Sequence, residues 1–149
     1  MKIISGGQTG VDRAALDVAL ELGLGCGGHC PKGRLAEDGP IAAKYPLQET
    51  PTADSSKRSE WNVRDSDGTL ILTSGGPTGG TALTVEFARR LRRPCLVVDL
   101  DLAVNMDAVT RWLAENGIQT LNIAGPRASE CPHAYALAVA VLRKLCRGM

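Results

Sequence analysis

The chain has 149 residues, of which 44% are hydrophobic and 22% are charged, and its formal net charge is +1. This length corresponds to one globular domain, and the composition excludes an intrinsically disordered chain. The near-zero net charge argues against binding duplex DNA or an anionic membrane through bulk charge. With aromatic residues at only 3%, the core must be aliphatic, and we expect one domain over residues 1–149.

The first 25 residues predict a strand, a glycine loop and a helix. Lys2–Ser5 is a short strand, and residues 6–10 form the glycine loop. From Val11 to Leu22 apolar residues recur at spacings of three and one, which is the pattern of an amphipathic helix. Gly23 ends that helix.

Residues 24–66 have weaker periodicity and contain several prolines. Residues 24–30 are consistent with a glycine-rich second strand, and residues 59–65 with a short helix that buries Trp61. Between them lies a long polar loop. Loops longer than ~12–15 residues inside a compact domain are usually functional or disordered.

The strand–helix pattern returns three times in the second half of the chain. The expected strands cover residues 69–73, 94–98 and 119–123, and the helices that follow them run over residues 83–91, 106–113 and 134–145. Near-continuous apolar strands between amphipathic helices are typical of a parallel sheet covered on both faces. We predict an α/β fold: a single doubly wound Rossmann-like domain whose mainly parallel five-stranded sheet has the order 2-1-3-4-5.

Two glycine loops, at residues 6–10 and 74–81, each join a strand to a helix. Glycines let the backbone close on an anion, and a helix N-terminus offers unpaired N–H groups and a positive dipole end. The order 2-1-3-4-5 makes the two strands neighbours, so both loops would line one crevice. The loops predict a phosphate or nucleotide-like site. The alternative is that the glycines only make tight turns. Neither loop matches a named phosphate motif, and no Walker lysine is present.

Charged residues follow the expected second strand. Lys32 and Arg34 could clamp an anionic ligand, while Glu37 or Asp38 could hold a hydroxyl or amino group. The alternative is a solvated loop with local ion pairs.

Two further arginines lie close to the expected crevice. Arg13 is within one turn of the first glycine loop, and Arg127 follows the last strand. We expect Asp12 to favour the helix dipole rather than to act as a base. Only Trp61 or Tyr45 could stack on a ligand near this place.

The five cysteines are an odd number without a dense framework, which is typical of reduced thiols in a cytoplasmic protein. No apolar run matches a signal peptide or a membrane span. Cys26 and Cys30 flank His29 at poor zinc spacing, and Cys131 with His133 lacks a partner set, so no metal site is expected. A redox or metal role of Cys26 and Cys30 stays open.

Taken together, these motifs resemble the putative molybdenum carrier family. The matching segments cover residues 6–17 (GGQTGVDRAALD), 30–34, 36–39, 45–47, 49–50, 58, 61–63, 66–69, 79–81, 83–84, 121–122 and 124–127. The resemblance implies a Rossmann-like fold in the group that includes lysine-decarboxylase-like phosphoribohydrolases and a DNA-uptake protein. It also implies a homo-oligomer, dimer or tetramer, that binds molybdenum cofactor, a pterin phosphate, without catalysing a reaction on it.

Carried onto this sequence, the resemblance implies that the two glycine loops hold the phosphate and that cations balance its charge. The expected binding residues are Gly6, Gly7, Gln8, Thr9, Gly10, Arg13, Lys32, Gly33, Arg34, Gly79, Gly80, Thr81 and Arg127. The ligand is molybdenum cofactor or another phosphorylated pterin or nucleotide. No membrane or nucleic-acid partner is expected.

Two other functions stay open. The phosphoribohydrolase pattern Pro-Gly-Gly-x-Gly-Thr-x-x-Glu is broken here, because Thr78 follows Pro77 and Thr84 stands three residues after Thr81. The candidate catalytic carboxylates would then be Glu37, Asp38 and Glu86. The third function is a nucleotide-sensing interaction module in which the ligand switches an interface.

Overall fold

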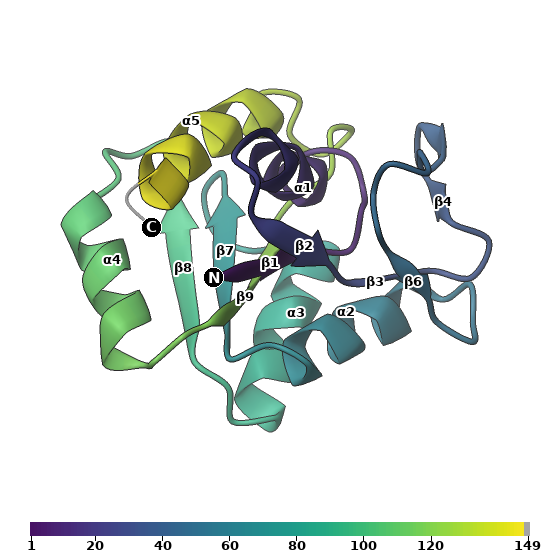
Figure 1. The fold of residues 1–149 in the computed structure, drawn as a ribbon, viewed down its shortest axis with the longest axis horizontal. Coiled ribbons are helices and arrows are strands. Elements are labelled where there is room, and N and C mark those ends of the chain that lie inside the picture. The colour runs from purple at the N-terminus through teal and green to yellow at the C-terminus, as the bar shows by residue number, and fades with distance from the viewer. Residues whose placement is uncertain (148–149) are drawn as a thin grey trace.

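The computed structural model describes residues 1–147, which form an α/β domain around a five-stranded parallel sheet (Figure 1). All five predicted strands are present. They are β1 (Lys2–Ile4), β2 (Gly25–Gly27), β7 (Gly68–Thr73), β8 (Cys95–Asp99) and β9 (Thr120–Ala124). The α/β class and the parallel sheet are therefore confirmed.

The strand order differs from the prediction. The sheet runs β2-β1-β9-β7-β8, so β9 lies between β1 and β7, and the order 2-1-3-4-5 is wrong. Ile3 pairs with Leu121 on one side of β9, and Leu70 pairs with Ile123 on the other. Burial explains the arrangement. The middle of β9 is fully buried, as a central strand requires, whereas Val97 in β8 is 42% exposed, as an edge strand permits.

Helices cover both faces of the sheet, as predicted. On one face α1 (Val11–Glu21) and α4 (Met106–Glu115) pack against α5 (Ala134–Arg147), and on the other α2 (Ser55–Arg64) packs against α3 (Gly79–Arg90) (Figure 1). None of these helices is long and apolar enough to cross a membrane.

The core is aliphatic. Between the sheet and the α1, α4 and α5 layer it contains alanine, valine, leucine and isoleucine side chains from every strand of that sheet except β2, joined by Cys131 and Cys146. On the opposite face a smaller cluster holds Val63, Phe87 and Ala88. A core of this kind is what the low aromatic content predicts.

The segment between β2 and α2 has two short ladders. β3 (His29–Cys30) pairs with β6 (Gln48–Glu49), and β4 (Leu35–Ala36) pairs with β5 (Gly39–Pro40). The guanidinium of Arg34 holds the segment together because it donates to the carbonyls of Leu47, Ala42 and Tyr45 at 3.0, 2.9 and 3.0 Å.

Candidate functional site

A cavity of about 120 Å³ lies where the loops after β1 and β9 meet the first turns of α2 and α3. It is lined by Gln8, Asp12, Ser55, Ser56, Arg58, Ser59, Gly80, Thr81, Leu83, Thr84, Ala124, Gly125, Pro126, Arg127 and Glu130. The cavity is at the carboxyl ends of the central strands, which is the usual ligand position in an open α/β sheet.

Three helix N-termini converge on this cavity. Asp12 is the second residue of α1, Ser55 and Ser56 begin α2, and Gly80 and Thr81 are in the first turn of α3. In the described residues, the first turn of α2 is capped by the Asp54 carboxylate, but neither α1 nor α3 has a side-chain cap. No capping side chain therefore covers the first turns of α1 and α3. The Val11 N–H donates to the Pro126 carbonyl at 3.3 Å and the Thr81 N–H to the Thr78 carbonyl at 3.1 Å, so an anion at α3 would meet the N–H groups of Gly79 and Gly80.

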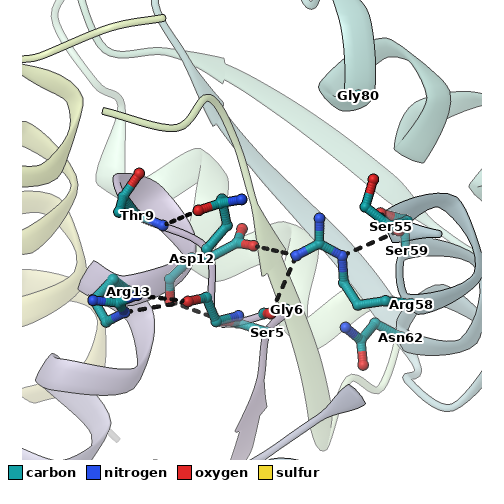
Figure 2. A network of polar contacts seen from close by, with 12 residues as sticks. Ser5, Gly6, Thr9, Asp12, Arg13, Ser55, Arg58, Ser59, Asn62 and Gly80 are labelled. Carbon is teal, nitrogen blue, oxygen red and sulfur yellow. Dashed lines mark hydrogen bonds and ion pairs between the residues drawn. The ribbon is translucent and has the colours of Figure 1, made fainter. Parts of the chain in front are cut away.

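Two of the lining residues, Arg58 and Asp12, form a largely buried ion pair (Figure 2). The Arg58 Nη1 atom is 3.4 Å from Asp12 Oδ2 and donates to the Gly6 carbonyl at 3.1 Å, while its Nε donates to the Ser55 carbonyl at 3.2 Å. Burial raises the pKa of Asp12 to about 6, although Arg58 and backbone N–H groups oppose this shift. The cavity is therefore lined by two arginines, Arg58 and Arg127, and by two carboxyl groups, Asp12 and Glu130, and of these carboxyl groups Asp12 has its pKa raised to about 6.

The position of Arg58 follows from the anchoring of α2. One turn further along this helix, the buried Asn62 amide accepts from the His29 N–H at 2.8 Å and donates to the His29 carbonyl at 3.1 Å. These two bonds fasten α2 to β3. The guanidinium of Arg58 is thereby directed across to the first glycine loop.

The two glycine loops have different roles in the structure. A methyl group on Gly6 would lie 2.4 Å from Arg58 Nη1, and one on Gly10 would lie 2.3 Å from the Pro126 carbonyl oxygen. Glycines in the first loop are thus needed for close packing. Gly79 and Gly80 have open space where a side chain would begin, so the second loop can admit a ligand to the backbone.

The structure brings four of the expected binding residues onto the cavity wall: Gln8, Gly80, Thr81 and Arg127. The other expected residues of the loop at residues 6–10 do not line the cavity, and Gly79, the first residue of α3, does not line it either. The Arg127 guanidinium pairs with Glu130 at 2.8 Å and stays about half exposed. Part of the expected site is therefore assembled here.

Arg13 does not line the cavity. Its guanidinium donates to the Gly7 carbonyl at 3.0 Å and to both carboxylate oxygens of Asp38 at 3.0 and 3.2 Å. This pairing holds the pKa of Asp38 below its usual value. Arg13 therefore binds the first glycine loop, and Asp38 pairs with Arg13, without either residue lining the cavity.

The expected anion clamp is also away from the cavity. Lys32 is exposed, the Gly33 N–H donates to Glu49 Oε1 at 2.6 Å, and Arg34 serves the loop carbonyls described above. None of the three lines the cavity. The alternative, local contacts within the loop, describes Gly33 and Arg34, whereas Arg58 and Arg127 are the cations that line the cavity.

The other candidate carboxylates are engaged elsewhere. Glu37 accepts from the hydroxyls of Thr9 and Ser129, the latter at 2.6 Å, and these bonds lower its pKa. Glu86 pairs with Arg89 and Arg90 on the outer face of α3, which lowers its pKa to about 2. Neither carboxylate lines the cavity.

Sequence reasoning missed the contribution of α2, namely Ser55, Ser56, Arg58 and Ser59. The sequence pattern predicts a helix from Ser59, which leaves the residues before it in the polar loop, whereas α2 begins at Ser55. The run Asp54-Ser55-Ser56 is an N-cap signal that would have placed Arg58 in the first turn.

Neither aromatic candidate for stacking reaches the cavity. The Trp61 ring packs edge-on against His29 at 5.3 Å between centroids, and the buried Tyr45 donates its hydroxyl to Asp17 at 2.5 Å. The apolar wall is formed instead by Leu83, Ala124 and Pro126.

Metal ligands do not gather in the part of the chain that the structure describes, where no three His, Cys, Asp or Glu side chains could hold an ion. Cys26 and Cys30 are unpaired thiols there, and burial raises the pKa of each.

Comparison with known proteins gives one matching family and one similar crystal structure. Residues 3–146 match the model of the circularly permutated YpsA SLOG family. A crystal structure of a putative molybdenum carrier protein from Syntrophus aciditrophicus SB is 52% identical and superposes with a TM-score of 0.93, covering 97% of this chain and 93% of that one. Comparison with curated protein sequences gives no match. The family match includes every residue of the cavity wall.

Proposed function

Because the chain belongs to the circularly permutated YpsA SLOG family, we propose that it binds or carries a phosphorylated cofactor, molybdenum cofactor or a related nucleotide, without catalysing a reaction on it. The crystal structure that is 52% identical belongs to a protein named as a putative molybdenum carrier, which favours the pterin phosphate over an ordinary nucleotide.

The convergence of three helix N-termini beside Arg58 carries this proposal. Each helix contributes the equivalent of roughly half a positive charge at its N-terminus. Backbone N–H groups of the first turn of α3 face a phosphate without a side chain between, because Gly80 has none. Protonation of Asp12, whose pKa is about 6, removes the one buried negative charge that opposes an anion.

The size of the cavity indicates which part of the ligand it takes. Pockets for whole drug-sized ligands have volumes of ~300–1,000 Å³, whereas this cavity has about 120 Å³. We therefore assign the phosphate group to it. A second cavity of about 180 Å³ shares Thr81, Pro126 and Glu130 with the first, and the pterin or nucleoside part would extend into it.

One observation favours a second function. A carboxyl group in a cavity with its pKa near 6 is what a general acid or base requires. Asp12 would then serve a nucleoside-monophosphate phosphoribohydrolase, in place of Glu37, Asp38 and Glu86. Release of free base from a panel of monophosphates, abolished by Asp12→Asn, would establish this function.

The test of the binding proposal is a thermal-shift screen against molybdenum cofactor, pterin phosphates, nucleoside mono-, di- and triphosphates, and molybdate. A ligand at a hundred times its Kd stabilises the fold by ~2.7 kcal/mol, which shifts the midpoint by several degrees. We expect the shift with cofactor or pterin phosphate. A shift with molybdate alone would indicate a simple oxyanion site, and no shift with any compound would refute the proposal.

A matched pair of variants ties the shift to the cavity. Gly80 has no atom within 4 Å of the place where a side chain would begin, so both Gly80→Asp and Gly80→Asn should fold. The aspartate places a negative charge among the phosphate donors and should abolish the shift, whereas the neutral asparagine should retain part of it. Light scattering of the same samples tests the expected homo-oligomer and any ligand-dependent change of it.

A further inference from the structure

Within residues 1–147, the outer edge of β8 has no partner strand, because β8 pairs with β7 alone and lies last in the sheet (Figure 1). Successive residues of a strand direct their backbone groups alternately to its two sides. The Leu100 N–H donates to the Thr73 carbonyl at 2.7 Å, so the even-numbered residues of β8 bond β7. The backbone groups of Cys95, Val97 and Asp99 therefore point to the open edge.

This edge is not blunted in the way that exposed edges usually are. Proteins protect an exposed edge with a very short strand, a lysine, a proline or a bulge. At the other end of the sheet, β2 has only three residues, two of them glycine. β8 has five residues, Cys-Leu-Val-Val-Asp, and the exposed Val97 is at its centre. In the described chain, no loop or side chain bonds the backbone of Cys95 or Val97. The edge is therefore suited to pairing with another strand.

The charges that flank β8 indicate which strand that is. Arg92 and Arg93 precede the strand, whereas Asp99 and Asp101 lie at its other end. Arg93 and Asp101 are exposed, and each stands four residues from Val97. In an antiparallel pair of β8 strands centred on Val97, Arg93 of one copy would lie opposite Asp101 of the other. The same edge thus supplies both halves of two ion pairs, which is the self-complementarity that a twofold dimer requires.

We propose that β8 forms the interface of a twofold-symmetric dimer, in which it pairs antiparallel with β8 of a second copy and joins the two sheets into one. Val97 exchanges both backbone bonds with Val97 of the second copy, and Cys95 does so with Asp99 on each side of the axis. On the face covered by α4 and α5, Leu96 lies opposite Val98 of the second copy. A slip of the register by two residues would separate Arg93 from Asp101, so the flanking charges fix the alignment.

The proposed interface is separate from the candidate binding site. No residue of β8 lines the 120 Å³ cavity or the 180 Å³ cavity beside it. Dimerisation through β8 therefore requires no ligand and occupies neither cavity. The experiments below use the purified full chain without ligand, so their outcome is independent of the binding proposal.

Light scattering of the full chain and two variants at Val97 is the first experiment. We expect the wild-type chain to have the mass of two chains, or of four if a second interface joins the dimers. Val97→Lys places two ammonium groups opposite each other on the twofold axis and should halve the mass. Val97→Thr keeps a β-branched, uncharged side chain and should leave the mass unchanged. A monomeric wild-type chain, as expected if the edge binds a strand of a different protein, would overturn the proposal. So would a Val97→Lys protein that keeps the wild-type mass.

A charge exchange tests the register. Arg93→Asp alone, or Asp101→Arg alone, places like charges opposite each other twice in the dimer. Each should raise the Kd of dimerisation by about tenfold or more. The double variant Arg93→Asp with Asp101→Arg restores opposite charges across the interface and should regain most of the affinity. A local folding defect would persist in the double variant, because Arg93 donates to the Arg64 carbonyl and Asp101 accepts from Ser74 within the chain. A double variant that dimerises no better than the single ones would overturn the proposed pairing.

Discussion

Arg58 Nη1 lies 3.4 Å from Asp12 Oδ2 and so joins the first turns of two helices that pack on opposite faces of the sheet. The two side chains are 12% and 10% exposed. The pKa of Asp12 is nevertheless raised, to about 6, because the cost of burying the carboxylate exceeds the attraction of the arginine. The attraction of Arg58 therefore does not fully offset the cost of burying the charged Asp12 carboxylate.

The first prediction concerns pH. The pKa of Asp12 is about 6 in the folded protein and 3.8 in the unfolded chain, so the folded state binds the extra proton between these values. The stability from this group is present at low pH and lost as pH rises through 6. Since one pKa unit corresponds to 1.36 kcal/mol, unfolding free energy should fall by roughly 1.4 kcal/mol from pH 5 to pH 7.

Urea unfolding at several pH values, with Asp12→Asn as the control, checks this. The asparagine variant cannot take up the proton, so its stability should lack that part of the pH dependence. Parallel curves for the two proteins would mean that Asp12 titrates normally.

The second prediction concerns Arg58. Arg58→Met removes the partner of a buried carboxylate and two backbone contacts. At pH 8 we expect a loss of ~3 kcal/mol in unfolding free energy, and a smaller loss at pH 5, where Asp12 is protonated. Arg64→Met on the same helix is the control, because the Arg64–Asp65 pair is largely exposed and should contribute at most ~1 kcal/mol. Equal losses for the two variants would contradict the assignment.

The third prediction isolates the contact between the loops after β1 and β9. Gly10 and Gly75 have similar positive φ angles, 79° and 75°, but only Gly10 faces another backbone. Gly75→Ala should cost ~1 kcal/mol from the backbone conformation alone. Gly10→Ala should cost several kcal/mol more, because its methyl group would lie 2.3 Å from the Pro126 oxygen and because its ψ of −131° at a positive φ is disfavoured for alanine. Thermal unfolding of both variants measures the difference, and similar midpoints would refute the contact.

The fourth prediction tests whether Glu37 is structural. Glu37 Oε1 accepts from the Ser129 N–H at 3.0 Å, and the Thr9 hydroxyl that bonds Glu37 accepts from the Ala128 N–H at 3.0 Å. Glu37→Gln should increase hydrogen exchange at Ala128 and Ser129. Glu86→Gln should leave both amides unchanged. If exchange stays the same in Glu37→Gln, the carboxylate does not fasten this loop.

Much of the fold could be predicted because helices and strands are local. Apolar residues at spacings of three and one located the helices from Val11 and Ala134, short apolar runs located β1, β7, β8 and β9, and a glycine-rich stretch located β2. The predicted strand order is wrong because it assumes that β7, β8 and β9 follow β1 across the sheet in the same order as along the chain. Nothing in the spacing of residues 119–123 indicates that this last strand is central, since its neighbours β1 and β7 are both remote in sequence.

Some residues of the candidate site could likewise be located from the sequence, and others could not. Gln8, Thr81 and Arg127 were found because each stands at the end of a strand or the start of a helix. Lys32 and Arg34 were expected there from their charge, from their position after the second strand and from the family resemblance, but neither residue lines the cavity.

Residue types and short-range periodicity were enough to predict the α/β class, the aliphatic core and the two glycine loops, because each of these features is local. The positions of three pairs of partners depend on the folded chain: β9 separates β1 from β7, Arg58 meets Asp12, and His133 meets Asp101. Pairing across 32 residues or more depends on which faces and edges pack together, and the burial of the whole chain determines this rather than any local pattern.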